Sequence, residues 1–297
     1  AGKDSTTGHW EIAGLVTKTP FPTFPNGFPD ELIQKLEKAW GRKIIVNKPY
    51  SGTDVLRDFG EEHIKTGNII VYTSGDSVLQ VAVHSSVADC NTLYKMCEQA
   101  RALCRGKYAV GRVIARPFVG SYPNFVRTHE RMDYSLTPPQ KTVLNKLQEC
   151  GKKVISVGKI NALFNGYGID VSFVTHSDAE GMEETLKLIN RDFNGLCFVN
   201  LVDFDTEYGH RNNIDGYAEN LSNMDKYVGK IIKKLNNDDM LIITADHGCD
   251  PGTPSTDHSR ENVPVLVYQK NKDSKNLGTL NSFAEIGKIA YNALVEK

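Results

Sequence analysis

The stretch LCFVNLVDFDTEYGH (196–210) joins an apolar run to an aspartate and a histidine. A second stretch, MLIITADH (240–247), ends its own apolar run on the same two residue types. Runs of this length and β-branched content are typical of buried strands in a parallel sheet. Because parallel strands present an active site at their carboxyl ends, the two stretches are predicted to direct carboxylates and imidazoles into one crevice.

Acidic and histidine residues recur as three short clusters in the last third of the chain: Asp205-x4-His210, Asp246-His247 and Asp257-His258. Mixed carboxylate and imidazole sets suit Zn, Mn or Fe ions, and two such sets suit a metal pair. A single cluster could equally be a helix cap beside a surface or core histidine. Three clusters, two of them at strand ends, favour a metal site.

The composition is typical of a soluble globular protein and argues against several classes of function. The 297 residues are 40% hydrophobic and 24% charged, with a formal net charge of −1. This balance gives no electrostatic footprint for nucleic acid or an anionic membrane, and no apolar run is long enough to span a bilayer. Six cysteines occur without a CxxC pair, so we expect free thiols and a cytoplasmic protein.

Alternating strand-like and helix-like segments in the second half of the chain predict an α/β fold with a doubly wound parallel core. Two proline-containing stretches, TKTPFPTFPNGFPD (17–30) and DYSLTPP (133–139), are typical of domain boundaries. The segment between them is predicted to form an inserted α+β module. The predicted domains are residues 1–20 (the first part of the core), 21–136 (the inserted module) and 137–297 (the metal-binding part of the core).

Periodicity and turn residues locate the individual elements. Strands are predicted at 43–47, 68–74, 110–117, 153–158, 173–176, 196–202, 240–245 and 263–269. Helices are predicted at 30–40, 86–104, 138–150, 178–191, 215–235 and 281–295. The segment that starts at residue 110 reads as a strand only as far as Pro117.

The N-terminal segment GKDSTTGHW (2–10) carries three adjacent hydroxyls, those of Ser5, Thr6 and Thr7. A hydroxyl is a poor nucleophile at its free pKa, and a metal pair nearby would lower that pKa and orient the attack. Alone, the segment could as well be a turn or a helix cap. Together with a metal pair, a nucleophile is the favoured interpretation.

Four motifs together resemble the phosphopentomutase (phosphodeoxyribomutase) family of the alkaline phosphatase superfamily. They are GKDSTTGHWEIAG (2–14), VGRVIARPFVG (110–120), NLVDFD…GHR (200–211) and TADHG…TDHSRE (244–261), in the order of the family. The TADHG motif alone indicates only the superfamily, and GKD-x-x-TGHWE narrows it. The resemblance implies an alkaline-phosphatase-like core with an inserted cap domain. It also implies interconversion of (deoxy)ribose 1-phosphate and 5-phosphate through a phosphoenzyme at a dinuclear metal site.

The resemblance further implies how the metals are held. Asp205, His210 and His258 would bind one ion. Asp246 and His247 would bind the other, together with an aspartate on the first core strand of the family. No segment of this chain matches that strand, so we expect one ligand to be absent unless a second chain supplies it. Mn²⁺ is the metal of the family, and a sugar bisphosphate is its activator.

The remaining site residues also follow from the resemblance. Ser5 matches the phosphorylated position, where the family usually has threonine, and a shift of the motif onto Thr6 stays open. Arg112 and Arg127 match positions that bind the phosphate of a sugar phosphate, and guanidinium forks suit phosphate oxygens. Asp76 matches a position that contacts ribose hydroxyls. Without the resemblance, a surface salt bridge would be the favoured role of each.

Three other functions remain open from the sequence. A metal-dependent phosphatase or phosphodiesterase could use the same core and would release inorganic phosphate. A phosphoglycerate mutase is disfavoured by the GKD-x-x-TGHWE and cap motifs. A truncated, non-catalytic metal-binding fragment would hold a single ion and associate through an exposed sheet edge.

Overall fold

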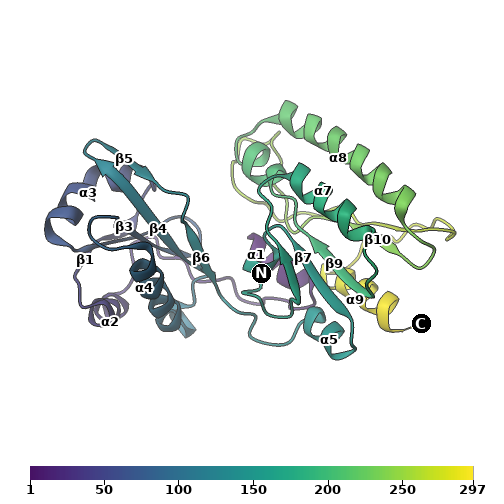
Figure 1. The fold of residues 1–297 in the computed structure, drawn as a ribbon, viewed down its shortest axis with the longest axis horizontal. Helices are drawn as coiled ribbons and strands as arrows, with labels where there is room; N and C mark the ends of the chain where they lie inside the picture. The colour runs from purple at the N-terminus through teal and green to yellow at the C-terminus, as the bar shows by residue number, and fades with distance from the viewer. Residues whose placement is uncertain (297) are drawn as a thin grey trace. The chain divides into compact units, whose positions relative to one another are not determined.

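The computed structural model of the protein describes residues 1–296, which form two compact units (Figure 1). The core unit consists of residues 1–19 and the chain from residue 137 onward. The inserted unit consists of residues 20–136. Each unit has its own sheet and its own buried apolar clusters.

A parallel three-stranded sheet forms the centre of the core unit, in the order β8-β7-β9. Its strands are β7 (Lys153–Val157), β8 (Val171–Phe173) and β9 (Gly195–Val199). Val157 is paired with Phe173 on one side and with Val199 on the other, so the carboxyl ends of the three strands meet at one edge. The prediction of an α/β core with parallel strands is confirmed.

Helices cover both faces of this sheet, as Figure 1 shows. The helices of the core unit are α1 (Ser5–Ile12), α5 (Val143–Glu149), α6 (Ile160–Leu163), α7 (Asp178–Ile189), α8 (Ile214–Lys234) and α9 (Ala284–Val295), with a π-helix at Phe204–Gly209. Helices α7 and α8 pack together on one face, where Met182 meets Met224 and Ile231. Helices α5 and α9 pack together on the other face. Across residues 1–296, every helix is too short or too polar to cross a bilayer.

One prediction about the core sheet is wrong. Strand β10 (Met240–Ile243) pairs with β11 (Leu266–Gln269) in antiparallel orientation, and among the described residues no ladder joins it to β9. A short apolar run indicates a strand but does not reveal its neighbour, which is the reason for the error. The aspartate beyond β10 is brought to the site by contact with α1, since Nδ1 of His9 lies 3.1 Å from Oδ2 of Asp246.

The inserted unit is built on one mixed sheet with the order β1-β2-β3-β4-β5, and β6 also pairs with β4. Its elements are α2 (Asp30–Trp40), β1 (Ile44–Pro49), α3 (Asp54–Thr66), β2 (Ile69–Thr73), β3 (Val78–His84), α4 (Cys90–Leu103), a 3-10 helix (Gly106–Tyr108), β4 (Arg112–Ser121), β5 (Asn124–Arg127) and β6 (Met132–Ser135). Leu36 of α2 and Cys97 of α4 pack in a cluster on one face of the sheet. Leu56 of α3 packs with Tyr72 and Phe118 in a cluster on the other.

Two element boundaries differ from the prediction at prolines. Helix α5 begins at Val143 rather than at 138, because Thr142 and Asn145 form a capping box there. Strand β4 continues through Pro117 to Ser121. The ladder with β6 ends at Ala115 and the ladder with β5 begins at Phe118, so Pro117 lies in the gap between them, where a missing amide is tolerated.

Candidate metal centre

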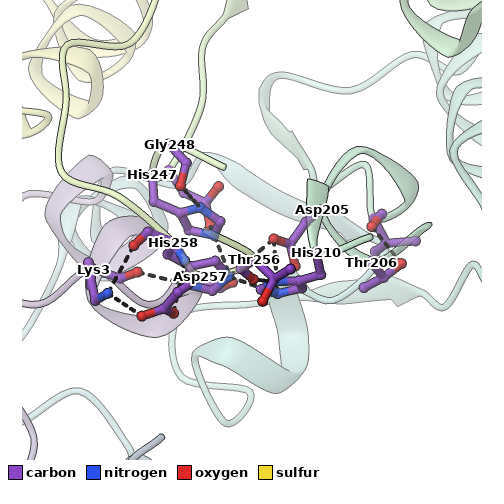
Figure 2. A network of polar contacts seen from close by, with 12 residues as sticks. Lys3, Asp205, Thr206, His210, His247, Gly248, Thr256, Asp257 and His258 are labelled. Carbon is purple, nitrogen blue, oxygen red and sulfur yellow. Dashed lines mark hydrogen bonds and ion pairs between the residues drawn. The ribbon is translucent and has the colours of Figure 1, made fainter. Parts of the chain in front are cut away.

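Three ligand atoms from two segments of the core unit converge on one point (Figure 2). Oδ1 of Asp205 lies 3.3 Å from Nε2 of His210 and 3.1 Å from Nε2 of His258, and the two histidine nitrogens are 3.1 Å apart. Asp205 belongs to the π-helix that follows β9, and His210 is the residue that ends this helix. The structure therefore brings together the three residues that the sequence assigned to one site.

Backbone carbonyls orient both histidines of this group. Nδ1 of His210 donates to the carbonyl of Thr256 at 2.6 Å, and Nδ1 of His258 donates to the carbonyl of Lys3 at 2.8 Å. Because a carbonyl can only accept, Nδ1 of each ring carries a proton and Nε2 is the atom turned toward Asp205. Metal-binding histidines are held by outer partners in this way. The oxygen and nitrogen donors fit a divalent ion such as Mn²⁺ or Zn²⁺.

Asp205 and His258 shift each other's pKa in opposite directions. Burial alone would raise the pKa of Asp205, but the hydrogen bond and charge of His258 outweigh burial and lower the pKa. Burial alone would lower the pKa of His258, but the hydrogen bond to Asp205 outweighs burial and raises it. A metal ion that binds Nε2 of His258 must therefore displace a proton.

Metal affinity is expected to rise with pH. Since the pKa of His258 is raised, protons compete with the metal below that pKa, and the competition fades as the pH rises through it. We expect Mn²⁺ to bind at least about tenfold more tightly at about pH 8 than at about pH 6. Calorimetry in buffers of different ionisation enthalpy measures both the affinity and the proton released. A variant of exposed His129, His129→Gln, should show the same profile, and an affinity independent of pH would contradict the assignment.

A second group of ligands surrounds Asp246. Oδ2 of Asp246 lies 3.3 Å from Nε2 of His247 and 3.1 Å from Nδ1 of His9. Nε2 of His247 also lies 3.2 Å from the hydroxyl oxygen of Ser5. The rings of His247 and His258 stack with their centroids 3.8 Å apart, so the two groups are adjacent. A carboxylate, an imidazole and a hydroxyl thus meet beside the first ligand set.

The charges in this second group are set by burial and by one ion pair. Burial alone would raise the pKa of Asp246, but the charge and hydrogen bond of His9 outweigh it and lower the pKa far below its usual range. The pKa of His9 is raised, because Asp246 outweighs the effect of burial. Burial lowers the pKa of His247, so this ring is neutral near pH 7. Its Nδ1 lies 3.3 Å from the carbonyl of Gly248, which favours a proton there and a lone pair on Nε2.

Helix α1 positions the hydroxyl of Ser5. The carboxylate of Asp4 accepts from the amide of Thr7 at 3.0 Å and from its hydroxyl at 2.9 Å, so Asp4 caps the helix. Ser5 is the first residue of the helix and its hydroxyl reaches His247. The Thr6 side chain is buried, at 4% exposure, and the Thr7 hydroxyl is committed to the cap. Of the three hydroxyls, that of Ser5 is the one in contact with a ligand.

His9 and Lys3 contact the site although sequence reasoning assigned neither a role there. His9 follows Ser5 by four residues on one helix, and this spacing, which places both on one face, could have identified it. Lys3 pairs with Asp257 and donates to the carbonyl of His258 at 3.0 Å. Asp257 therefore holds the loop that carries His258 rather than joining the ligands, as Figure 2 shows.

Cys249 is a further residue that the motifs did not indicate. Its sulfur and the ligand atoms of Asp205 and His210 all lie within 4.8 Å of one another. Burial, followed by the negative charge of Asp205, raises the pKa of this thiol to about 12. A Cβ atom at Gly209 would lie 2.6 Å from the sulfur, so glycine at that position leaves room for the thiol.

The predicted sugar-phosphate residues belong to the inserted unit, not to the core unit that carries the ligands. Asp76 is exposed in the turn between β2 and β3. Arg112, at the start of β4, lies 3.4 Å from a carboxylate oxygen of Asp133. Arg127 is the exposed last residue of β5.

The α/β core and the clustered carboxylate and imidazole ligands define a metal-dependent enzyme class, and the family model of the metalloenzyme superfamily matches residues 3–296. Phosphopentomutase of Lachnoclostridium phytofermentans is 56% identical over 287 residues, which cover 96% of this chain and 74% of that protein. Phosphopentomutase of Carboxydothermus hydrogenoformans is 57% identical over 286 residues, with the same coverage of both chains. Phosphopentomutase of Acetivibrio thermocellus is 53% identical, covering 99% of this chain and 76% of that protein. The chain belongs to the phosphopentomutase family, a family of isomerases.

Among solved structures, the PH0037 protein from Pyrococcus horikoshii is similar at a TM-score of 0.45 and 15% sequence identity. The matched region covers 61% of this chain and 59% of that one. A likeness this weak adds nothing to the family assignment.

Proposed function

We propose that this chain interconverts ribose 1-phosphate and ribose 5-phosphate, and the corresponding deoxyribose phosphates, through a phosphorylated Ser5. The observation that carries the proposal is the 3.2 Å approach of the Ser5 hydroxyl to Nε2 of His247, inside a group of metal-ligand side chains. Membership of the phosphopentomutase family supports the choice of substrate.

In this proposal, Asp205, His210 and His258 hold one divalent ion, and Asp246 and His247 hold a second, with Mn²⁺ as the resident metal. Bound metal would neutralise charge on the phosphoryl oxygens and lower the pKa of the attacking hydroxyl. His9 keeps Asp246 ionised and oriented, because its Nδ1 donates toward Oδ2 of that carboxylate.

Ser5 carries the phosphoryl group in both halves of the reaction. In the first half, the bond from phosphorus to Oγ of phosphorylated Ser5 breaks as a bond forms to the free sugar hydroxyl, which gives up its proton. In the second half, the other phosphate of the sugar bisphosphate moves to Oγ, and the new sugar hydroxyl takes up a proton. The proton that the sugar hydroxyl gives up in the first half is taken up by Oγ of Ser5, and Oγ gives it up again in the second half.

The remaining assignments complete the proposal. Arg112 and Arg127 bind the phosphate that is not reacting, and Asp76 binds ribose hydroxyls. A sugar bisphosphate primes the enzyme by phosphorylating Ser5, and the reaction takes place in the cytoplasm. The expectation that a second chain supplies a further ligand stays a prediction that no observation supports.

The test separates a mutase from a phosphatase on the same core. The full chain is incubated with ribose 1-phosphate, Mn²⁺ and a sugar bisphosphate, and ribose 5-phosphate and inorganic phosphate are both followed with time. We expect ribose 5-phosphate to accumulate with at most trace release of inorganic phosphate. Stoichiometric release of inorganic phosphate without the isomer would instead establish a phosphatase, and neither product would favour a non-catalytic metal-binding chain.

A further inference from the structure

Asp178 is a buried acidic residue of the core unit that has no part in the proposed reaction. It is the first residue of α7 and is 0% exposed. Ser177 caps this helix, because its hydroxyl accepts from the amide of Glu180 at 3.2 Å. The carboxylate of Asp178 is therefore not needed for the cap. Since burial of a carboxylate is costly unless its oxygens accept hydrogen bonds, its partners indicate its role.

Asp178 and Asp203 hold each other through their backbone amides. Oδ1 of Asp178 accepts from the amide of Asp203 at 2.8 Å, and Oδ2 of Asp203 accepts from the amide of Asp178 at 2.8 Å. Oδ2 of Asp178 accepts from the side-chain amide of Asn220, on α8, at 2.7 Å. One carboxylate thus ties together the start of α7, the residue before the π-helix, and α8.

Hydrogen bonds hold the two carboxylates together against their charge. Burial raises the pKa of Asp178, the bonds from the amide of Asp203 and from Asn220 lower it in part, and the negative charge of Asp203 raises it. Apolar groups of the same shape can replace a buried hydrogen-bonded pair at little cost in stability. Apolar groups would not fix the direction of a backbone amide, so we look for the role of Asp178 in the segment that begins at Asp203.

That segment is the π-helix Phe204–Gly209, which carries Asp205 and ends at His210. The amide of His210 donates to the carbonyl of Asp205 at 3.0 Å, which is a bond across five residues. In an α-helix, residues five apart point about 140° away from each other, whereas a bond from i to i+5 brings them closer to one side. The π-helix therefore allows Oδ1 of Asp205 to lie 3.3 Å from Nε2 of His210.

The contact with Asp178 fixes the point at which the π-helix begins. The carboxylate of Asp203 bonds to α7 instead of capping the π-helix, and the amide of Asp203 is held in return. Asp205 follows two residues later on the same turn. A shift of the held amide would therefore move the carboxylate of Asp205 away from Nε2 of His210 and of His258.

We propose that Asp178 is a positioning residue for the metal ligand Asp205. Its carboxylate holds the amide of Asp203 and so keeps the π-helix in the geometry that brings Asp205 and His210 to one ion. The inference rests on the proposed function, because it concerns the ion that Asp205, His210 and His258 hold there. It assigns a role to a residue outside all four sequence motifs.

The test measures Mn²⁺ binding to the full chain by electron paramagnetic resonance, which detects the free ion. Asp178→Ala is expected to weaken binding about 10- to 100-fold, the usual effect of losing an outer partner of a metal ligand. Asp178→Asn keeps an oxygen for the amide of Asp203, and the side chain of Asn220 can turn to accept from the new amide group. This conservative variant should therefore keep most of the affinity.

Ser177→Ala is the matched control. It removes the cap of the same helix one residue away, so its Tm should fall, but the hydrogen bonds of Asp178 stay in place. Its Mn²⁺ affinity should equal that of the parent. An unchanged affinity in Asp178→Ala, or an equal loss in Ser177→Ala, would overturn the proposal.

Asn220→Ala keeps the proposal testable if Asp178→Ala does not fold. It removes only the donor to Oδ2 of Asp178, and alanine favours the helix. We expect a loss of at least about threefold in Mn²⁺ affinity, and no loss would contradict the positioning role. Since Mn²⁺ binding needs no turnover, these affinities could follow the expected order in a chain that forms no ribose 5-phosphate. That result would refute the mutase proposal and leave the role of Asp178 intact.

Discussion

Replacement of Ser5 by alanine is expected to abolish isomerisation, with a loss on the order of 10⁴-fold or more in kcat. The hydroxyl lost is the one that contacts His247, and in the proposed reaction it carries the phosphoryl group in both half-reactions. The fold should be retained, because the Asp4 cap uses Thr7 and not Ser5. Isomerisation and covalent phosphate, the latter by intact-mass spectrometry after exposure to a sugar bisphosphate, are the two measurements.

Thr6→Val is the control for the alternative nucleophile. It removes a hydroxyl one residue away on the same helix, in a side chain that is 4% exposed. We expect this variant to keep most of its activity and to gain one phosphoryl group as the parent does. Full activity in Ser5→Ala, together with its loss in Thr6→Val, would move the nucleophile to Thr6.

Gly8→Ala is expected to destabilise the core unit and to disable the site together. A Cβ atom at Gly8 would lie 2.1 Å from the carbonyl oxygen of Asp246, a distance that forces α1 away from the loop beyond β10. Overpacking of this kind costs about 2–3 kcal/mol in the free energy of unfolding. The shift would also separate His9 from Asp246 and Ser5 from His247, and displacements of about 1 Å can cost about 100-fold in rate.

The control for this substitution is Gly229→Ala on the exposed side of α8. A Cβ atom there meets nothing within 4 Å, so only helix propensity changes, and we expect a gain of about 0.5–1 kcal/mol. Urea unfolding of both variants, with metal content by elemental analysis, gives the comparison. Equal stability of Gly8→Ala and the parent would mean that α1 does not depend on this close approach.

The fold of the core could be predicted from the sequence where a predicted strand pairs in parallel with another predicted strand close to it in the chain. The stretches that became β7 and β9 are short apolar runs between helical segments, and such runs pair in parallel with the strands beside them. The run that became β10 has the same local character, yet its partner is β11 in the opposite direction. The choice of partner depends on packing between distant segments, which periodicity does not contain.

The residues of the candidate metal centre also divide into those that the sequence indicates and those whose role appears only in the folded chain. Asp205, His210 and His258 were recognisable because their residue types and motifs indicate metal binding. In the structure, their ligand atoms lie within 3.3 Å of one another. Cys249 was not recognisable, and only its helical spacing from Ser5 pointed to His9. His9 gains its role from an ion pair to Asp246, and Cys249 from a backbone approach at Gly209, and both contacts exist only in the folded chain.

Residue types and their order establish the chemistry available to this protein: its ligand residues, its hydroxyl segment, its arginines and its α/β character. How these groups are brought together is visible only in the folded chain. It places the hydroxyl of Ser5 against a histidine 242 residues away, and it turns Asp257 toward Lys3 instead of the ligands. It also ties the amide of Asp203 to the buried carboxylate of Asp178. Residue type limits what a side chain can bind, whereas distance, burial and neighbouring charge determine what it does bind.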